Sequence, residues 1–245
     1  MKLAAMQPYF FPYLGYFDLL NIVDEWIVFD ISQYRRHAWL NRNRVLHPVS
    51  GWQYIIVPVR KHHLATPIKD IQISMHEDWR SRIMRQLKHY QKDAPYYVEV
   101  SSFLEDCFLN VEEGLAEANV TFFKRVAERL GIKRRIHTFS EMNLQLDGAV
   151  ECAGDWGLRI AQAMGAKEFI NRPGGAGLFD RDAFRELDIT LSIQSFRDFE
   201  YACGSRGFQP NMSIIEVMMW NSPREIMNYL NTFRHREDAS SKDAQ

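Results

Sequence analysis

The sequence predicts an α/β protein: an open, largely parallel sheet of the Rossmann/HUP-like kind, with helices on both faces, a β-hairpin insertion and a central helical region. Three observations predict this class. Short apolar runs alternate with helix-like spacing over residues 2–29 and 133–193, which is typical of parallel strands joined by helices. Aromatic and β-branched segments flank the turn-forming residues 47–51, which predicts a hairpin. Residues 76–131 have amphipathic spacing and predict a helical subdomain.

Local signals justify the expected elements. Gln7-Pro8 ends the first strand, Gly131 stops a helix, and Ser213 is an N-cap with Glu216 placed to complete a capping box. The expected strands span residues 2–6, 26–29, 39–46, 52–58, 68–73, 133–139, 168–171 and 189–193. The expected helices span residues 13–22, 76–92, 98–130, 151–164, 180–187, 213–220 and 223–233. We expect one domain over residues 1–233 and a disordered, charged tail over 234–245.

The composition argues against several classes of function. With 245 residues, 46% of them apolar, the chain can bury a core of its own. Lys and Arg total 30 against 31 Asp and Glu, so no overall field favours nucleic acid. No window approaches the ~20 apolar residues of a membrane span, and we expect a cytoplasmic location. The three cysteines lack the spacing of a zinc site or a disulfide scaffold.

Polar side chains follow strands at the edge where α/β sheets bind ligands. Gln7 and Asp30 fall just past the carboxyl ends of the first two strands, and Asn171 ends a later one. Gly174 and Gly175 then form a loop where backbone can come close to a ligand, although a turn with positive φ explains these glycines equally well. These residues are candidates for a small-molecule crevice.

The aromatic segment 7–17 contains Gly15 at the start of the first helix. Its position resembles the HxGH turn of nucleotidyltransferases, with Pro12 and Tyr16 where that motif has histidines. The helix N-terminus favours a phosphate or carboxylate, but neither replacement carries the charge that stabilises a transferred phosphate. Aromatic residues such as Tyr9 either wall a pocket or pack a core.

The segment Asn41-Arg42-Asn43-Arg44 offers two guanidinium groups and two amides. In a strand, Arg42 and Arg44 share one face and the asparagines share the other, so only one pair faces a crevice. Arginine forks suit carboxylate or phosphate groups, and an exposed polar edge strand is the alternative. Ser213 caps a helix whose free amides also suit a phosphate.

Several motifs together resemble the WbqC-like protein family, in order from Met1 to about Tyr229. They are MQPYFFPYLGYFDLL, Asp30 with Gln33-Tyr34, Asn41-Arg42-Asn43-Arg44, Leu130-Gly131-Ile132, Asn171 with Gly174-Gly175 and Leu178-Phe179-Asp180, and Ser213-Ile214-Ile215-Glu216. The opening motif makes the resemblance specific. Glu216 stands where the family usually has Asp, and Ser222 where Gly is common.

The resemblance implies an intracellular bacterial enzyme, a transferase or ligase that modifies a sugar or polar metabolite in O-antigen, polysaccharide or specialised-metabolite biosynthesis. We expect Asp30 to be the general base for an attacking amine or hydroxyl, and Arg42 to clamp an anionic group of the substrate or activated donor. The expected substrate-binding residues are Gln7, Tyr9, Gly15, Asn41, Asn43, Asn171, Gly174, Gly175 and Ser213. The expected partner is a small molecule, a sugar or amine-bearing metabolite with or without nucleotide activation, and not nucleic acid.

Two other functions stay open. A nucleotidyl- or adenylyltransferase would use Asp30 to hold Mg²⁺ and the Gly15 turn to admit a nucleoside triphosphate. A non-catalytic binding or assembly subunit of a glycan-modifying complex would instead expose Tyr9, Phe10 and Phe11 as a flat apolar patch. The sequence specifies no metal site, cofactor or oligomeric state.

Overall fold

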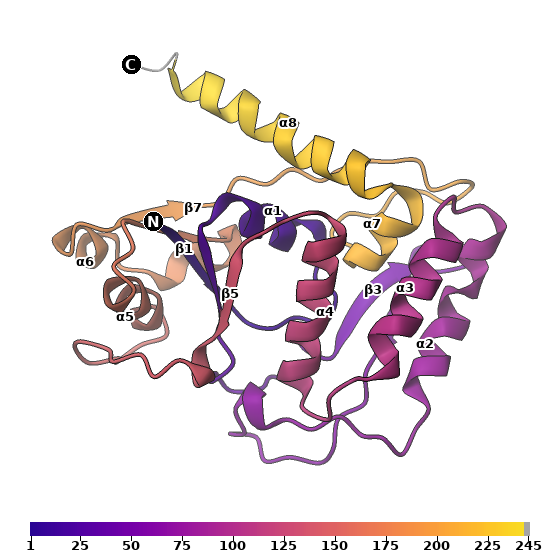
Figure 1. The fold of residues 1–245 in the computed structure, drawn as a ribbon, viewed down its shortest axis with the longest axis horizontal. Helices are drawn as coiled ribbons and strands as arrows, with labels where there is room; N and C mark the ends of the chain where they lie inside the picture. Colours follow the sequence, from indigo (N-terminus) through magenta and orange to yellow (C-terminus); the bar gives the residue numbers. More distant parts are fainter. Residues whose placement is uncertain (243–245) are drawn as a thin grey trace.

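A five-stranded sheet forms the centre of the protein in the computed structural model, which describes residues 1–242, with side chains to residue 232 (Figure 1). Its strands are β1 (Lys2–Met6), β2 (Glu25–Val28), β5 (Arg135–Thr138), β6 (Glu168–Asn171) and β7 (Thr190–Ile193). They stand in the order β5-β2-β1-β6-β7, and each neighbouring pair is parallel. The chain adds strands on one side of β1 and then on the other, so the order reverses between β1 and β6.

Helices and 3-10 turns surround the sheet. They are α1 (Leu14–Ile22), η1 (Ile68–Asp70), α2 (Trp79–Leu87), η2 (Lys88–Lys92), α3 (Tyr97–Leu109), α4 (Leu115–Arg129), η3 (Phe139–Glu141), α5 (Asp155–Ala163), η4 (Pro173–Leu178), α6 (Arg181–Glu186), α7 (Ile214–Trp220) and α8 (Pro223–Lys242). The helical region expected over 98–130 is divided into α3 and α4, because the chain turns between them. Gly131 has φ 74° and ends α4 as expected.

Each face of the sheet has its own apolar core, because side chains alternate along a strand. Leu3 and Ile27 pack with residues of α5 and α6 on one face. Ala4 and Trp26 pack with residues of α1 and α4 on the other. Figure 1 shows α5 and α6 at one end of the molecule, α2 and α3 at the other, and α4 between them. The α/β class, the parallel sheet and the helices on both faces are confirmed.

The predicted hairpin is a separate two-stranded sheet. β3 (Arg42–Leu46) and β4 (Trp52–Ile56) pair antiparallel, with Arg44 opposite Tyr54. Gly51 has φ 66° in the turn between them. The hairpin insertion is therefore confirmed.

The strand predicted over residues 68–73 is wrong, because the chain forms η1 there and then makes isolated bridges. Ile68 and Ile71 are fully buried and lie three residues apart, which is the spacing of a 3-10 turn. The Ile71 N–H donates to the Ile68 carbonyl and closes this turn. The apolar alternation was misleading because only Ile71 and Ile73 are two residues apart, whereas Ile68 and Ile71 are three apart.

The last helix, α8, is described as a helix to Lys242. The tail expected to be disordered over 234–245 falls where no side chain is described, and residues 243–245 lie outside the described residues altogether. Disorder of this tail stays a prediction.

A buried carboxylate links the hairpin to the C-terminal helices. Glu216 of α7 is 1% exposed and accepts hydrogen bonds from the Leu46 N–H (2.9 Å), the Tyr90 hydroxyl and Trp220 Nε1 (2.7 Å). Ser213 caps α7 as expected, but Glu216 does not complete the capping box because its carboxylate is used here. Burial raises the pKa of Glu216, although its hydrogen-bond donors act in the opposite direction.

We expect Glu216→Gln to flatten the dependence of stability on pH. Because the folded pKa of Glu216 lies above its ordinary value of 4.5, the contribution of this carboxyl to stability is full below that pH and is lost as pH rises through the folded pKa. Glutamine has a similar volume but does not ionise. Urea unfolding midpoints at mildly acidic and mildly alkaline pH measure the effect, with the exposed Glu105→Gln as the control. An unchanged pH profile in Glu216→Gln would contradict this account.

Candidate functional site

Polar side chains gather where the parallel strands end, as the sequence predicted. Gln7 and Asp30 follow β1 and β2, Ser140 lies just beyond β5, and Asn171 with Arg172 ends β6. Because β5, β2, β1 and β6 are neighbours in that order, these residues form a row along one edge of the sheet. Ser140 and Arg172 were not singled out from the sequence. Each directly follows a predicted strand, and that position was the available signal.

Asp30 is the buried carboxylate of this row. It is 1% exposed, and its two oxygens accept from one residue: Oδ1 from the Ser140 N–H (3.1 Å) and Oδ2 from Ser140 Oγ (2.5 Å). The Asp30 carbonyl accepts from the Lys69 N–H of η1. Ser140 itself is exposed. A protein hydroxyl therefore lies between the buried carboxylate and the surface.

A polar cleft of about 500 Å³ opens at this position, between the ends of β2 and β5 and the helix α4. It is lined by Asp30, Lys69, Asp70, Glu112, Ala116, Glu117, Val120, Thr121, Lys124, Thr138, Ser140 and Glu141. Carboxylates outnumber ammonium groups in this lining, so the cleft favours a ligand that is cationic or rich in hydrogen-bond donors. In the part of the chain that the structure describes, no group of three or more His, Cys, Asp or Glu is arranged to hold a metal ion.

Gln7 and Tyr9 lie beside a much smaller cavity next to this cleft. The Gln7 amide donates to Ser32 Oγ (2.8 Å), and Tyr9 stacks on Tyr16 with 5.0 Å between ring centroids. The cavity, of about 10 Å³, is also lined by Asn119 and Val120, and Val120 borders the larger cleft as well. Asn119 Oδ1 is buried without a hydrogen-bond partner. Gln7 and Tyr9 therefore line a separate cavity, which shares Val120 with the Asp30 cleft.

Asn43 and Ser213 hold the aromatic turn that follows β1. Asn43 Nδ2 donates to the carbonyls of Phe10 (3.0 Å) and Phe11 (2.8 Å), and Ser213 Oγ donates to the same Phe11 carbonyl (2.8 Å). Phe11 has φ 39°, which is unusual for a residue with a side chain. Both polar side chains are buried against backbone, so these contacts are structural, and the substrate-binding role expected for them stays a prediction.

The aromatic side chains of this turn do not form the expected partner surface. Phe10 and Phe11 are buried, and Phe11 stacks on Phe122 of α4 with 4.9 Å between centroids. Tyr9 is half-buried. The flat apolar patch that an assembly subunit would expose here is therefore absent from these residues, and that expectation is wrong.

Asn41 and Arg42 lie on the hairpin segment. Asn41 Nδ2 donates to the Val57 carbonyl (2.8 Å). The Arg42 guanidinium lies 4.2 Å from the centroid of the Tyr54 ring and donates to the His37 carbonyl (2.5 Å). Among the described residues, no hydrogen bond or ion pair joins Arg42 to Asp30. The anion-clamping role of Arg42 stays a prediction.

Arg172, which the sequence did not single out, meets the turn around the predicted Gly15 where the strand order reverses. The Arg172 guanidinium lies over the rings of Tyr13 (4.4 Å) and Tyr16 (4.9 Å) of the Gly15 turn. Burial raises the pKa of both tyrosines, while the arginine acts in the opposite direction. The phenols are therefore held neutral beside a permanent positive charge.

The glycines of this region have different roles. A Cβ on Gly15 would overlap the Tyr13 ring at 2.4 Å, so a larger residue there would require this ring to move. A Cβ on Gly175 would lie 3.0 Å from Asn171 Oδ1, whereas a Cβ on Gly174 would meet no atom within 4 Å. The open space beside Gly174 is compatible with the sequence-based expectation that a ligand approaches the backbone of this loop.

The fold and the cleft define an α/β protein with a polar site at the carboxyl edge of a parallel sheet. The chain belongs to the WbqC-like protein family, whose model matches residues 7–228. It is 30% identical over 234 residues to the uncharacterized protein Rv1507c of Mycobacterium tuberculosis, which covers 94% of this chain and 97% of that protein. The family resemblance read from the sequence is confirmed.

No solved structure matches the chain significantly, and the Rossmann/HUP-like part of the fold assignment stays a prediction. Each helix in the described part of the chain is too short or too polar to cross a membrane.

We expect Asn43→Ala to destabilise the protein by roughly 2–3 kcal/mol, because the buried Phe10 carbonyl would lose its side-chain donor and the Phe11 carbonyl would keep only Ser213 Oγ. Chemical unfolding measures the change in the free energy of unfolding. The exposed Asn143→Ala is the matched control and should have little effect. If Asn43→Ala were as stable as the unchanged protein, the holding role of this amide would be refuted.

Proposed function

We propose that this protein is a group-transfer enzyme that acts on an amine or hydroxyl of a sugar or similar polar metabolite, with Asp30 as its general base. One observation carries the proposal: a nearly inaccessible carboxylate reaches a polar cleft of about 500 Å³ through the exposed Ser140 hydroxyl. A nucleophile and a base within hydrogen-bond reach are the arrangement that proton abstraction needs.

The expected step places the acceptor group beside Asp30. An incoming neutral amine or hydroxyl takes the place of Ser140 Oγ as donor to Asp30 Oδ2 and attacks the transferred group of the activated donor. As the new bond forms, the bond between that group and the donor's leaving group breaks, and the leaving group departs with its electron pair. The acceptor's proton passes to Asp30 Oδ2. Ser140 keeps its backbone hydrogen bond to Oδ1, so the carboxylate stays oriented during the exchange. The excess of carboxylates in the lining supports an acceptor that carries an amine.

The position of an activated donor is supported by Arg172. This guanidinium lies where the strand order reverses, beside the Gly174 and Gly175 loop, which is where α/β sheets commonly bind anionic ligands. The transferase or ligase role in polysaccharide or specialised-metabolite biosynthesis, implied by the family, is part of the same proposal. Arg42 is the alternative clamp for the anionic group.

Nucleotidyl transfer is the second candidate, and Arg172 favours it specifically. Pro12 and Tyr16 replace the histidines of the HxGH turn, and the Arg172 guanidinium lies over the Tyr16 ring, so a positive charge returns to this turn from another strand. The strand order would suit a Rossmann/HUP-like nucleotide site. In this candidate Asp30 would hold Mg²⁺.

We expect amino sugars to raise the thermal unfolding midpoint and their N-acetylated forms not to raise it, because acetylation removes the charge that the cleft favours. The probes are glucosamine, galactosamine and their N-acetyl derivatives. Asp30→Asn should abolish the shift, whereas the exposed Asp147→Asn should keep it. The absence of any shift, or an equal shift in Asp30→Asn, would argue against an amine acceptor at Asp30.

Nucleotidyl transfer predicts pyrophosphate release from ATP or CTP in the presence of Mg²⁺. We expect Arg172→Gln to reduce the release at least tenfold, and Arg224→Gln, an exposed arginine of α8, to leave it unchanged. No release and no thermal shift with any of the four nucleoside triphosphates would remove this candidate and leave the transfer proposal in place.

A further inference from the structure

One continuous stretch of the chain has only positive charge. Between Asp30 and Asp70 there is no Asp or Glu, although the protein as a whole has a formal charge of −1. The basic residues of this stretch are Arg35, Arg36, Arg42, Arg44, Arg60, Lys61 and Lys69. Such a block creates a local positive potential that the net charge conceals.

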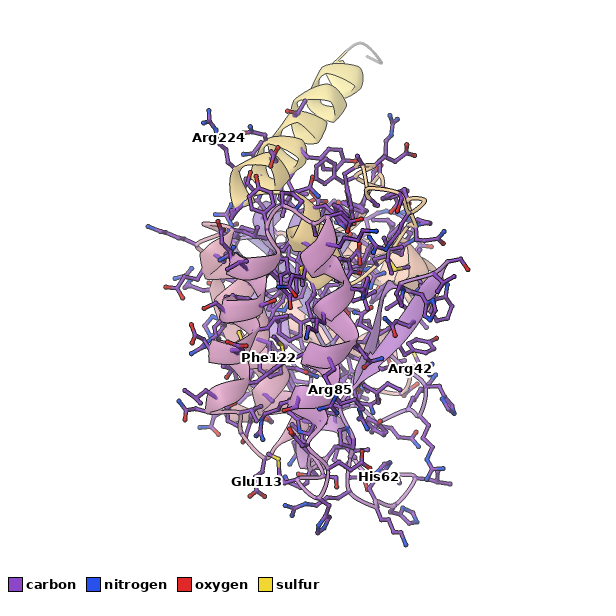
Figure 2. The ribbon with its side chains drawn as sticks, turned by 90° about the vertical axis from the view of Figure 1, so that its right-hand side faces the viewer. Arg42, His62, Arg85, Glu113, Phe122 and Arg224 are labelled. Carbon is purple, nitrogen blue, oxygen red and sulfur yellow. The ribbon has the colours of Figure 1, made fainter. Side chains whose placement is uncertain are left out.

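Contacts join the loops of this stretch, which we call the basic hairpin region (residues 31–69), to the Arg42 end of the hairpin. Gln33 Nε2 donates to the Leu64 carbonyl, and the Tyr34 ring packs edge-on to His62. His37 in turn contacts Arg42 of β3. Figure 2 shows Arg42 and His62 on the same lower side of the molecule, whereas Arg224 lies at its upper end. The loop residues 33–37 and 62–64 therefore lie beside the Arg42 end of β3.

The outer face of the hairpin interleaves arginines with aromatic rings. The Arg44 guanidinium lies 5.2 Å from the Trp39 ring centroid and 5.1 Å from that of Trp52, and Arg42 lies over Tyr54. Register pairing places Arg44 and Tyr54 on this face together. The two guanidinium groups are therefore held by aromatic rings and by the carbonyls of His37 and Asn211, and not by carboxylates.

Carboxylates neutralise little of the charge in the basic hairpin region. Arg60 pairs with Glu113 and Lys69 with Asp70. Within the described residues, Arg35, Arg36 and Lys61 form no salt bridge, and all three are exposed. Their charge is available to an external anion.

Apolar side chains are exposed among these charges. Val49 at the hairpin turn is 82% exposed and Leu64 is 71% exposed, and Trp52 and Ile56 on β4 are also exposed. These are half of the exposed large apolar residues in the described part of the chain, which also include Met75, Val98, Leu109 and Leu178. A surface that combines basic residues with exposed tryptophan and aliphatic side chains has the chemistry of the membrane interface.

We propose that the basic hairpin region docks the protein on an anionic membrane surface. Arg35, Arg36 and Lys61 attract the acidic headgroups, and Val49 with Trp52 enters the boundary between headgroups and acyl chains. The exposed aliphatic side chains favour a bilayer over a nucleic acid strand, because Val49 and Leu64 would make no specific contact with bases or phosphates. Single-stranded nucleic acid also needs open aromatic faces on which its bases can stack. Here the Arg44 guanidinium already lies over the Trp39 and Trp52 rings. This docking is independent of the reaction proposed above.

Co-sedimentation of the full chain with vesicles tests the proposal. We expect binding to phosphatidylcholine vesicles that contain phosphatidylglycerol, little binding to phosphatidylcholine alone, and weaker binding as salt is raised. The double variant Arg35→Ser/Arg36→Ser should weaken binding about tenfold to thirtyfold, since each basic residue near the surface contributes on the order of a fivefold gain. Val49→Ser should also weaken binding.

Matched controls separate this surface from general charge and hydrophobicity. Val98→Ser removes an apolar side chain of similar exposure, 76%, from α3, and Arg181→Ser/Arg224→Ser removes two exposed arginines elsewhere; both should bind as the unchanged protein does. The proposal is overturned by absence of binding to acidic vesicles, by equal losses in test and control variants, or by binding to single-stranded oligonucleotides without binding to vesicles.

Discussion

The Phe11 carbonyl is the point at which three distant parts of the chain meet. It accepts one hydrogen bond from Asn43 of the hairpin and another from Ser213 at the start of α7. The next carbonyl, that of Pro12, accepts from the Ile214 N–H. A residue with φ 39° needs such surroundings, because this backbone conformation is unfavourable unless neighbouring contacts fix it.

The rest of the candidate site follows from this constraint. Once the turn after β1 is fixed, α1 starts in a defined direction and Tyr13 and Tyr16 stand where Arg172 can lie over them. The same turn fixes Gln7 at the end of β1 beside β2 and Asp30. The hairpin and α7 therefore act on the sheet edge through backbone contacts, even where their side chains do not line the cleft.

Elements whose signals are local were predictable from the sequence. Apolar runs and helical spacing gave the five parallel strands and most helices, and the turn residues at 47–51 gave the hairpin. The rule that ligands bind at the carboxyl ends of parallel strands found Gln7, Asp30 and Asn171, because that position depends only on where a strand stops. The opening aromatic motif, together with the other motifs along the chain, indicated the family whose model matches residues 7–228.

The remaining features depend on partners far away in the sequence. Arg42 and Asn43 are adjacent polar residues, and the sequence alone makes both equally good candidates for ligand binding. Only the fold shows that Asn43 donates to the Phe11 carbonyl and that Arg42 lies over the Tyr54 ring. Ser140 is a candidate site residue only because its hydroxyl donates to Asp30, which lies 110 residues away in the sequence. Neither periodicity nor spacing contains such information, because it arises when strands from different parts of the chain become neighbours.

The bond between Ser213 and Phe11 spans 202 residues of sequence, and this has a consequence for biosynthesis. A ribosome makes β1 and its aromatic turn well before Ser213, so the Ser213 hydrogen bond forms only after α7 has emerged. Until then the nascent chain carries a phenylalanine-rich turn that lacks its hydrogen bond to Ser213. Contacts between residues so far apart in the sequence also slow folding, so the final packing of the β1 turn depends on the later synthesis of α7.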